Sequence, residues 1–354
     1  MRTYRIAAVP GDGIGQETVP AAVRVLDALA GLHGFRLEWT MHPWGCAYLA
    51  RTGTMMPADG LESLAGADAI LLGAVGAPGV PDHESLWGLL IPIRRHFDQF
   101  VSLRPVRSLA GVEGPLRDGR PFDLVVVREN TEGEYSEIGG RLYRGRPQEM
   151  AVQEAVFTRL GVERVARYAF ELAAKRSGRV ASATKSNGIV HTMPFWDEIL
   201  SEVAADYPDV ELTPYHVDAL AAHLVLDPAR FDVIVASNLF GDILSDLTAA
   251  LAGSIGIAPC GNIDPSRQHP SMFEPIHGSA PDIAGTGTAN PIGQIWSSSL
   301  MLDHLGEREA AARLTAAIGE VVRSGSLTPD LGGSLSTAQV CDALISALTK
   351  DTAL

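Results

Sequence analysis

Two aspartates, Asp242 and Asp246, stand four residues apart directly after the apolar run 233–236. In a helix this spacing puts both carboxylates on one face, and oxygen ligands suit a hard cation such as Mg²⁺ or Mn²⁺. The run before them is typical of a strand, and open α/β sheets bind ligands at the carboxyl ends of their strands. We therefore predict a divalent-metal site, against the alternative of a solvated charge pair in the first helical turn.

Lys185 is one of only three lysines in a chain with 25 arginines. Unlike arginine, a lysine can lose its proton near neutral pH when its surroundings lower its pKa, so it can serve as a general base. Lys185 follows a second apolar run, 180–183, and we predict that it acts as a base; an exposed lysine is the alternative. Tyr135 is a candidate for the matching acid. The alternative is a structural tyrosine whose ring packs against apolar side chains and whose hydroxyl contacts water.

Two arginines, Arg94 and Arg104, flank Asp98, and a third, Arg128, follows the apolar run 124–127. Guanidinium groups form bidentate hydrogen bonds with carboxylates, so three converging arginines would hold a dicarboxylic acid. Each of them taken alone is better explained as a surface charge. Arg94 and Arg95 are separated by about 100° around a helix, so at most one of these two points inward.

Two glycine-containing segments bear on cofactor binding. Residues 10–15, Pro-Gly-Asp-Gly-Ile-Gly, lack the spacing of the Rossmann fingerprint, and we interpret them as a tight strand-to-helix turn that needs glycine torsions. Residues 273–285, closing at Asn290, offer small residues for a pyrophosphate and Asp282 for a ribose hydroxyl. No Lys or Arg occurs between Gln268 and Glu307, which favours NAD over NADP. An irregular Gly/Pro loop is the alternative.

Short apolar runs alternate with longer periodic segments, which predicts an α/β fold with a largely parallel sheet. The length of 354 residues suits two domains. Residues 110–121 are a candidate crossing between domains. The pattern of residues 131–146 is typical of a projecting loop or hairpin arm, with an ordinary surface hairpin as the alternative. The expected strands are 5–9, 68–72, 124–127, 180–183 and 233–236, and the clearest helices are 18–30, 157–174, 307–322 and 337–348.

Composition excludes several classes of partner. A net charge of −14 argues against nucleic acid and anionic membranes, both of which need clustered cations. The three cysteines, Cys46, Cys260 and Cys341, show neither zinc spacing nor a disulfide pattern, and no apolar run reaches the length of a membrane span. A cytoplasmic location is expected.

Along the chain the arginine run comes first, followed by the strand end at Arg128, then Lys185, the metal helix 238–246 and the loop 277–290. In this order the motifs resemble the β-decarboxylating 2-hydroxyacid dehydrogenase family, which includes isocitrate and isopropylmalate dehydrogenases. The resemblance covers residues 5 to about 347. It implies a two-domain, non-Rossmann α/β fold with interleaved domains that share a large mixed sheet. Residues 1–99 and 253–354 would bind the dinucleotide, and residues 100–252 would bind substrate and metal and form the dimer, with an arm near 131–155. The implied protein is a homodimer with a shared active site.

The resemblance also implies individual roles. Asp242 and Asp246 would bind Mg²⁺ or Mn²⁺ with Asp218 of the neighbouring subunit, and Lys185, also from the neighbour, would deprotonate the substrate hydroxyl. Tyr135 would protonate the enol. Whether K⁺ is a further cofactor is left open by the resemblance. The substrate carboxylates would be bound by Arg94, Arg104 and Arg128, and the NAD by Glu274, His277, Gly278, Ser279, Ala280, Pro281, Asp282, Ile283, Asn290 and Asn187.

The helix turn 85–92, Ser-Leu-Trp-Gly-Leu-Leu-Ile-Pro, bears on the substrate. Gly88 and Leu90 offer no polar partner for the extra carboxylate of isocitrate, and Trp87 would shrink the space that isopropylmalate needs. The run resembles the tartrate and D-malate dehydrogenases of the family. It implies NAD-dependent conversion of D-malate to pyruvate and CO₂, with tartrate as a further substrate. Isopropylmalate oxidation and a catalytically silent regulatory subunit are the alternatives. Pro92 is unusual inside a helical turn, so the sequence leaves the local helix geometry open.

Overall fold

The computed structural model describes residues 1–116 and 119–350, and the chain divides into two compact units. Unit 1 comprises residues 1–99, 104–121 and 249–354, and unit 2 comprises residues 100–103 and 122–248. The chain passes between the units more than once, so the predicted interleaving and the α/β class are both confirmed. The chemical roles expected for the two domains stay predictions.

Unit 1 contains a mixed sheet. Its strands run in the order β2 (Phe35–Met41), β1 (Arg2–Gly11), β3 (Ala69–Ala74), β12 (Ser271–Pro275) and β11 (Pro259–Ile263). The first four pair in parallel, whereas β11 pairs with β12 in the antiparallel sense. Strand β4 (Val101–Arg107) has its first three residues in unit 2 and its remainder in unit 1.

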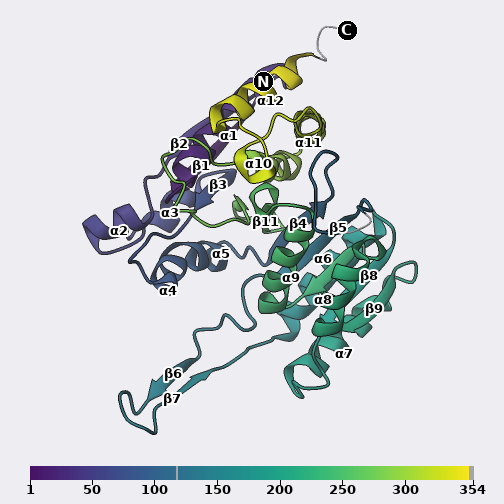
Figure 1. Ribbon diagram of the computed structural model, residues 1–354. Helices are drawn as coiled ribbons and strands as arrows, with labels where there is room; N and C mark the ends of the chain where they lie inside the picture. Colours follow the sequence, from purple (N-terminus) through teal and green to yellow (C-terminus); the bar gives the residue numbers. More distant parts are fainter. Residues whose placement is uncertain (117–118, 351–354) are drawn as a thin grey trace. The chain divides into compact units, whose positions relative to one another are not determined.

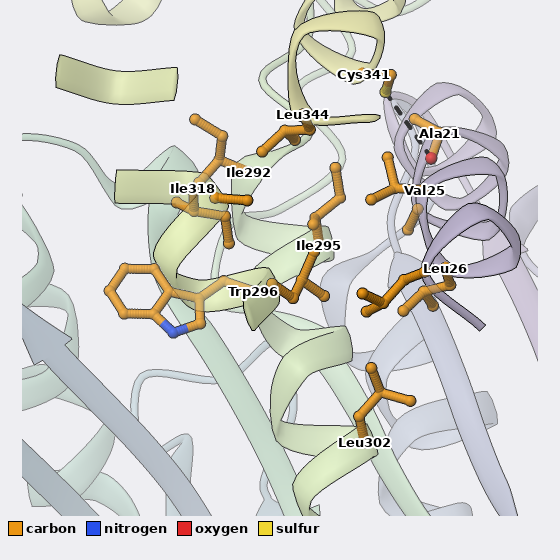
Figure 2. Close-up of a cluster of buried hydrophobic side chains, with 14 of the residues drawn as sticks. Ala21, Val25, Leu26, Ile292, Ile295, Trp296, Leu302, Ile318, Cys341 and Leu344 are labelled. Carbon is orange, nitrogen blue, oxygen red and sulfur yellow. Dashed lines mark hydrogen bonds between the residues drawn. The ribbon is translucent and has the colours of Figure 1, made fainter. Parts of the chain in front are cut away.

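Helices of unit 1 bury their apolar faces in one large core. Figure 2 shows side chains from α1 (Gly15–His33), α10 (Ile292–Leu305), α11 (Arg308–Arg323) and α12 (Thr337–Lys350) meeting in it. Helix α1 buries positions three and four apart, such as Ala22, Val25, Leu26 and Leu29, and ends where Gly34 adopts a left-handed conformation (φ 71°). Shorter helices are α2 (Cys46–Thr52), α3 (Gly60–Ala65), α4 (Asp82–Ser85), α5 (Ile91–His96), η3 (Ile255–Ile257) and η4 (Pro329–Leu331).

Unit 2 has a parallel sheet in the order β5 (Asp123–Glu129), β10 (Val233–Ala236), β8 (Arg179–Thr184) and β9 (Glu211–His216). All four residues of β10 are buried, as a central parallel strand requires. The helices are α6 (Arg159–Ala174), α7 (Thr192–Ala204), α8 (Val217–Leu226), η2 (Pro228–Arg230) and α9 (Asn238–Leu251), whose last residues belong to unit 1.

The predicted arm is present as an antiparallel hairpin of β6 (Gly139–Leu142) and β7 (Met150–Gln153). In Figure 1 it extends away from the rest of unit 2, and every residue of both strands is exposed. Of the other local expectations, each predicted strand and helix corresponds to an element, and residues 233–236 match β10 at both ends. The expected crossing at 110–121 includes Arg117 and Asp118, which lie outside the described residues.

The turn before Arg94 departs from α geometry. Residues Leu86–Leu90 form a π-helical turn, η1, between α4 and α5. Pro92 has no N–H to donate to the carbonyl four residues back, so the chain widens the turn there. A Cβ added at Gly88 would lie 2.6 Å from Cγ of Met55, which is 2% exposed. This position therefore has no room for a side chain.

Within the described part of the chain, no helix combines the length and the apolar character needed to cross a membrane. The three cysteines are buried thiols that form no disulfide, and burial raises the pKa of Cys46 to about 12 and that of Cys341 to about 11.

Close packing at Gly88 leads to a stability prediction. We expect Gly88→Ser to lower the free energy of unfolding by about 1–3 kcal/mol, because the new side chain overlaps Met55. Gly31→Ser in α1, where a Cβ would meet nothing within 4 Å, is the matched control and should be nearly neutral. Urea unfolding measures both. The penalty should shrink when Met55→Ala is also present, and an equal penalty in both backgrounds would contradict this packing account.

Candidate active site

Arg128, at the end of β5, is the centre of a charged cluster in unit 2. Its side chain is 2% exposed, and its Nε and Nη2 donate hydrogen bonds to Oδ1 of Asn238 at 3.2 and 2.6 Å. Its Nη1 forms an ion pair with Oδ1 of Asp242 on α9. A Cβ at Gly241 would lie 2.6 Å from Cβ of Arg128, so the glycine lets the helix approach the arginine closely. The buried cation is therefore paired and hydrogen-bonded, as its burial demands.

Tyr135 meets the same aspartate from a different segment. Its hydroxyl donates to Oδ2 of Asp242 at 3.0 Å, and its ring centroid lies 5.5 Å from Cζ of Arg128. The Asp242 side chain is 36% exposed, and Asp246, one turn further along α9, is exposed. The structure thus brings together the predicted acid, one predicted carboxylate-binding arginine and one predicted metal ligand.

The charge balance at Asp242 differs from the sequence argument, which considered only a metal as the neutralising cation. Arg128 supplies a positive charge directly. Among the described residues, no group of three or more His, Cys, Asp or Glu side chains within the chain is arranged to hold a metal ion. The carboxylates of Asp242 and Asp246 remain chemically suited to Mg²⁺ or Mn²⁺, with a partly exposed position open to a ligand.

Lys185 and Asp218 form a second charged group in unit 2. The Nζ of Lys185, just after β8, lies 2.8 Å from Oδ1 of Asp218 in the first turn of α8. Their side chains are 30% and 68% exposed, and the lysine lowers the pKa of the aspartate mainly by hydrogen bonding to it. Asn187 is exposed in the turn that follows Lys185. The predicted base and the predicted third metal ligand are therefore direct partners.

Arg94 is buried in unit 1, where it pairs with Glu274 of β12. Its Nη2 lies 2.6 Å from Oε1 of Glu274, and Nδ2 of Asn262 donates to the same oxygen at 2.7 Å. Its Nε is buried without a hydrogen-bond partner, which leaves one donor unused. Arg95 instead lies over the Trp87 ring at 4.9 Å, so only Arg94 points inward, as the helical spacing predicted.

Arg104 is likewise buried, in β4 of unit 1. The three predicted carboxylate-binding arginines thus belong to two different units, with Arg128 alone in unit 2. Leu90 is 8% exposed and packs in the unit 1 core with Ile93 and Phe97, whereas Trp87 is half-buried. The predicted role of each in substrate binding stays a prediction.

The loop after β12 carries the predicted dinucleotide contacts. Burial lowers the pKa of His277, whose Nε2 is buried without a partner. Asp282 is exposed. Asn290 is already engaged: its Oδ1 accepts from the amide of Ile292 at the start of α10, and its Nδ2 donates to Asp330, both at 3.0 Å. An unused buried nitrogen and an exposed carboxylate in one loop suit a ligand with several polar groups. The remaining predicted contacts in this loop are Gly278, Ser279, Ala280, Pro281 and Ile283.

The glycine-rich turn after β1 contacts this loop, which the sequence analysis did not foresee. Gly11 and Gly13 have φ of 71° and 53°, so the predicted glycine torsions are confirmed. A Cβ at Gly13 would lie 2.0 Å from the carbonyl oxygen of Ser279, and the amide of Ile14 donates to that oxygen at 2.9 Å. A cavity of about 550 Å³ borders the same turn, with His42 and other residues in its wall.

Sequence reasoning also missed the acidic residues that hold the Tyr135 segment. Glu129 is fully buried, and its carboxylate accepts from the amides of Thr131 and Glu132 at 2.8 and 3.0 Å. Burial raises the pKa of Glu129. Glu134 accepts from Ser237 and Leu239 next to the start of α9. Three glutamates within six residues were the available signal, but sequence alone does not reveal their partners.

Comparison with known proteins places this geometry in a family. Residues 5–344 match the isocitrate/isopropylmalate dehydrogenase family. The chain is 55% identical to a probable tartrate dehydrogenase/decarboxylase of Bacillus subtilis (strain 168), covering 99% of each protein, and 53% identical to the decarboxylating D-malate dehydrogenase of Escherichia coli (strain K12), covering 97% and 98%. The crystal structure of isocitrate dehydrogenase from Methylococcus capsulatus superposes with a TM-score of 0.89 at 36% identity, covering 98% of this chain and 100% of that one. This chain belongs to the isocitrate/isopropylmalate dehydrogenase family, and its relatives include decarboxylating dehydrogenases.

Proposed function

We propose that the protein oxidises and decarboxylates D-malate to pyruvate and CO₂ with NAD as the oxidant, and that tartrate is a further substrate. The observation that carries the proposal is the contact of Tyr135 and Arg128 with Asp242. This contact groups a proton donor, a carboxylate-binding cation and a metal-type ligand. Relatives named for tartrate and D-malate, each more than 50% identical over nearly the whole chain, support the choice of substrate class.

In this proposal Asp242 and Asp246 bind Mg²⁺ or Mn²⁺, and the loop from His277 to Asn290 binds NAD. When bound, the divalent ion supplies a Lewis acid for the oxygen functions of the substrate, and NAD supplies the hydride acceptor. The exposed Asp282 accepts from a ribose hydroxyl, and the absence of Lys and Arg from 269 to 306 leaves no cation for a 2′-phosphate. The unpartnered Nε2 of His277 is an available polar group for the dinucleotide.

The remaining steps fall to side chains of the chain itself. Arg128 binds a substrate carboxylate, and its buried position fixes the direction of its guanidinium group. The neutral amine of Lys185 accepts the proton of the substrate hydroxyl, and Asp218, whose Oδ1 lies 2.8 Å from Nζ, stabilises the ammonium group that forms. Tyr135 donates its hydroxyl proton to the enol left after CO₂ departs, and its hydrogen bond to Asp242 orients that hydroxyl. Arg94 and Arg104 complete the set of carboxylate-binding arginines.

Substrate size follows from the π-helical turn. Gly88 cannot be replaced by a residue with a polar side chain without meeting Met55, so no hydrogen-bonding group can project from that position. Arg95 lies over the indole of Trp87, with its Cζ 4.9 Å from the ring centroid. The bulk of the indole and the absence of a polar partner favour a short diacid over both isocitrate and isopropylmalate.

We propose further that two chains share each site in a homodimer. Lys185 and Asp218 pair with each other, and Tyr135 and Arg128 pair with Asp242, so each chain carries two distinct groups of site residues. Exposed apolar side chains on α8, α9 and the arm suit burial against a second copy: Val225, Leu226, Ile243, Leu142, Met150 and Val152. The Asp218 side chain, although paired with Lys185, is 68% exposed, so a second copy can approach it.

Two alternatives are distinguished by kinetics. Isopropylmalate oxidation would require space beside Trp87 for a branched alkyl group. A catalytically silent subunit would lack turnover altogether, which the retained acid and base residues argue against.

We expect kcat/KM for D-malate to exceed that for isopropylmalate by at least about tenfold, because one misfitting alkyl group typically has an effect of this size. NADH absorbance, followed with Mn²⁺ and a panel of 2-hydroxy diacids including isocitrate and the tartrate isomers, measures this ratio. Isopropylmalate as the best substrate would contradict the assignment, and no turnover on any member would favour the silent subunit.

Complementation tests the shared site. Lys185→Arg and Asp246→Asn should each lower kcat by about a hundredfold or more, because one removes the base and the other a metal ligand. If the two residues act in trans, refolding an equal mixture should restore about a quarter of wild-type activity, since half of the dimers would then hold one intact site. Lys175→Arg in the otherwise wild-type chain is the matched control and should retain full activity. A mixture no more active than either parent would contradict a shared site.

A further inference from the structure

Residues 131–135 carry Tyr135 from the end of β5 towards the arm, and glutamates fix this segment at both ends. Glu132 accepts from the amide and hydroxyl of Thr158 at 2.9 and 2.8 Å, which ties the segment to the start of α6. Gly133 has φ of 78°, and a Cβ there would lie 3.3 Å from Cβ of Asn238. The segment therefore turns sharply where it passes the start of α9.

Glu134 bridges this turn and α9 with both carboxylate oxygens. Its Oε1 accepts from Oγ of Ser237 at 2.7 Å, and its Oε2 accepts from the amide of Leu239 at 3.0 Å. Ser237 is fully buried, and Leu239 is in the first turn of the helix. Amides in that turn have no acceptor inside the helix and lie at its positive end, so a carboxylate is well suited to them. Glu134 is thus a helix-capping residue about a hundred positions away in sequence.

Two adjacent residues consequently attach to one helix. Glu134 binds its first turn, and the hydroxyl of Tyr135 reaches Asp242 one turn later. Because Glu134 is attached to the first turn of α9, the positions open to the hydroxyl of the adjacent Tyr135 are restricted. Without the hydrogen bonds of Glu134, a rotation about the backbone at residue 134 would carry the hydroxyl away from Asp242.

We infer that Glu134 is a positioning residue that holds the Tyr135 hydroxyl against Asp242 by capping α9. This inference rests on the proposed function, in which Tyr135 protonates the enol. Glu134 itself exchanges no proton with substrate, and its effect on the reaction passes through Tyr135.

The test uses full-length Glu134→Ala and Glu134→Gln, each alone and combined with Tyr135→Phe. Glutamine retains an oxygen for the amide of Leu239, so it should preserve most of the activity. Alanine removes the cap, and we expect kcat with D-malate to fall about tenfold or more while KM for D-malate and NAD changes less than about threefold. Glu171→Gln, an exposed charge change on α6, is the matched control and should behave as wild type.

Coupling to Tyr135 is the decisive comparison. In the Tyr135→Phe background, Glu134→Ala should lower kcat no further, because the hydroxyl that it positions is already absent. Effects that multiply would overturn the inference, as would a KM increase with unchanged kcat.

Hydrogen–deuterium exchange supplies a readout independent of activity. The amide of Leu239 should exchange at least about tenfold faster in Glu134→Ala than in wild type, with Glu134→Gln in between, because its acceptor is lost. Unchanged exchange at Leu239 refutes the capping role. A wild-type protein without turnover on any diacid refutes the proposed function instead, so the two failures are distinguishable. If Glu134→Ala fails to fold, Glu134→Gln still tests the capping role in two ways. One is the rate of amide exchange at Leu239, and the other is the kcat of Glu134→Gln compared with that of the double variant Tyr135→Phe/Glu134→Gln.

Discussion

Burial of the Arg128 cation is the constraint on which the rest of the candidate site depends. A guanidinium group that is 2% exposed loses most of its hydration, and it remains charged at any pH at which the protein functions. Its environment must therefore supply acceptors, which Asn238 and Asp242 provide from one face of α9. That requirement fixes the position of α9 beside β5, and Gly241 makes the close approach sterically feasible. Removing Asp242 would take an ionic partner away from a buried charge, a change that typically costs several kcal/mol.

The same pairing gives the site its chemical character. Asp242 contacts Arg128 through one oxygen and Tyr135 through the other, so a single carboxylate orients both a cation and a proton donor. Glu134 and Glu132 then hold the segment that carries Tyr135. Lys185 and Asp218 form a separate pair at the ends of neighbouring elements of unit 2. A second copy of the chain is the simplest source of the complementary group for each half, which is why we propose a shared site.

Much of this arrangement was predictable because it follows from short-range patterns. The buried run at β10, the i,i+4 aspartates on α9 and the inward direction of Arg94 each depend on local periodicity. Pro92 signalled an unusual turn here. The lack of space for a side chain at Gly88, however, is due to Met55, which is more than thirty residues away in sequence. The Arg94–Glu274 pair and the Glu134 cap join residues more than a hundred positions apart. Such contacts are set by tertiary packing, and no spacing rule in a single sequence reveals them.

The central claim is that Asp242 and Asp246 form a cation-binding edge of the active site despite the ion pair between Asp242 and Arg128. Anomalous diffraction from crystals soaked with Mn²⁺ and D-malate tests it most directly. The account predicts a manganese peak within about 2.0–2.5 Å of a carboxylate oxygen from each aspartate, with the substrate hydroxyl also in contact with the ion. A manganese-free site in which Asp242 remains bound only to Arg128 and Tyr135 would contradict it.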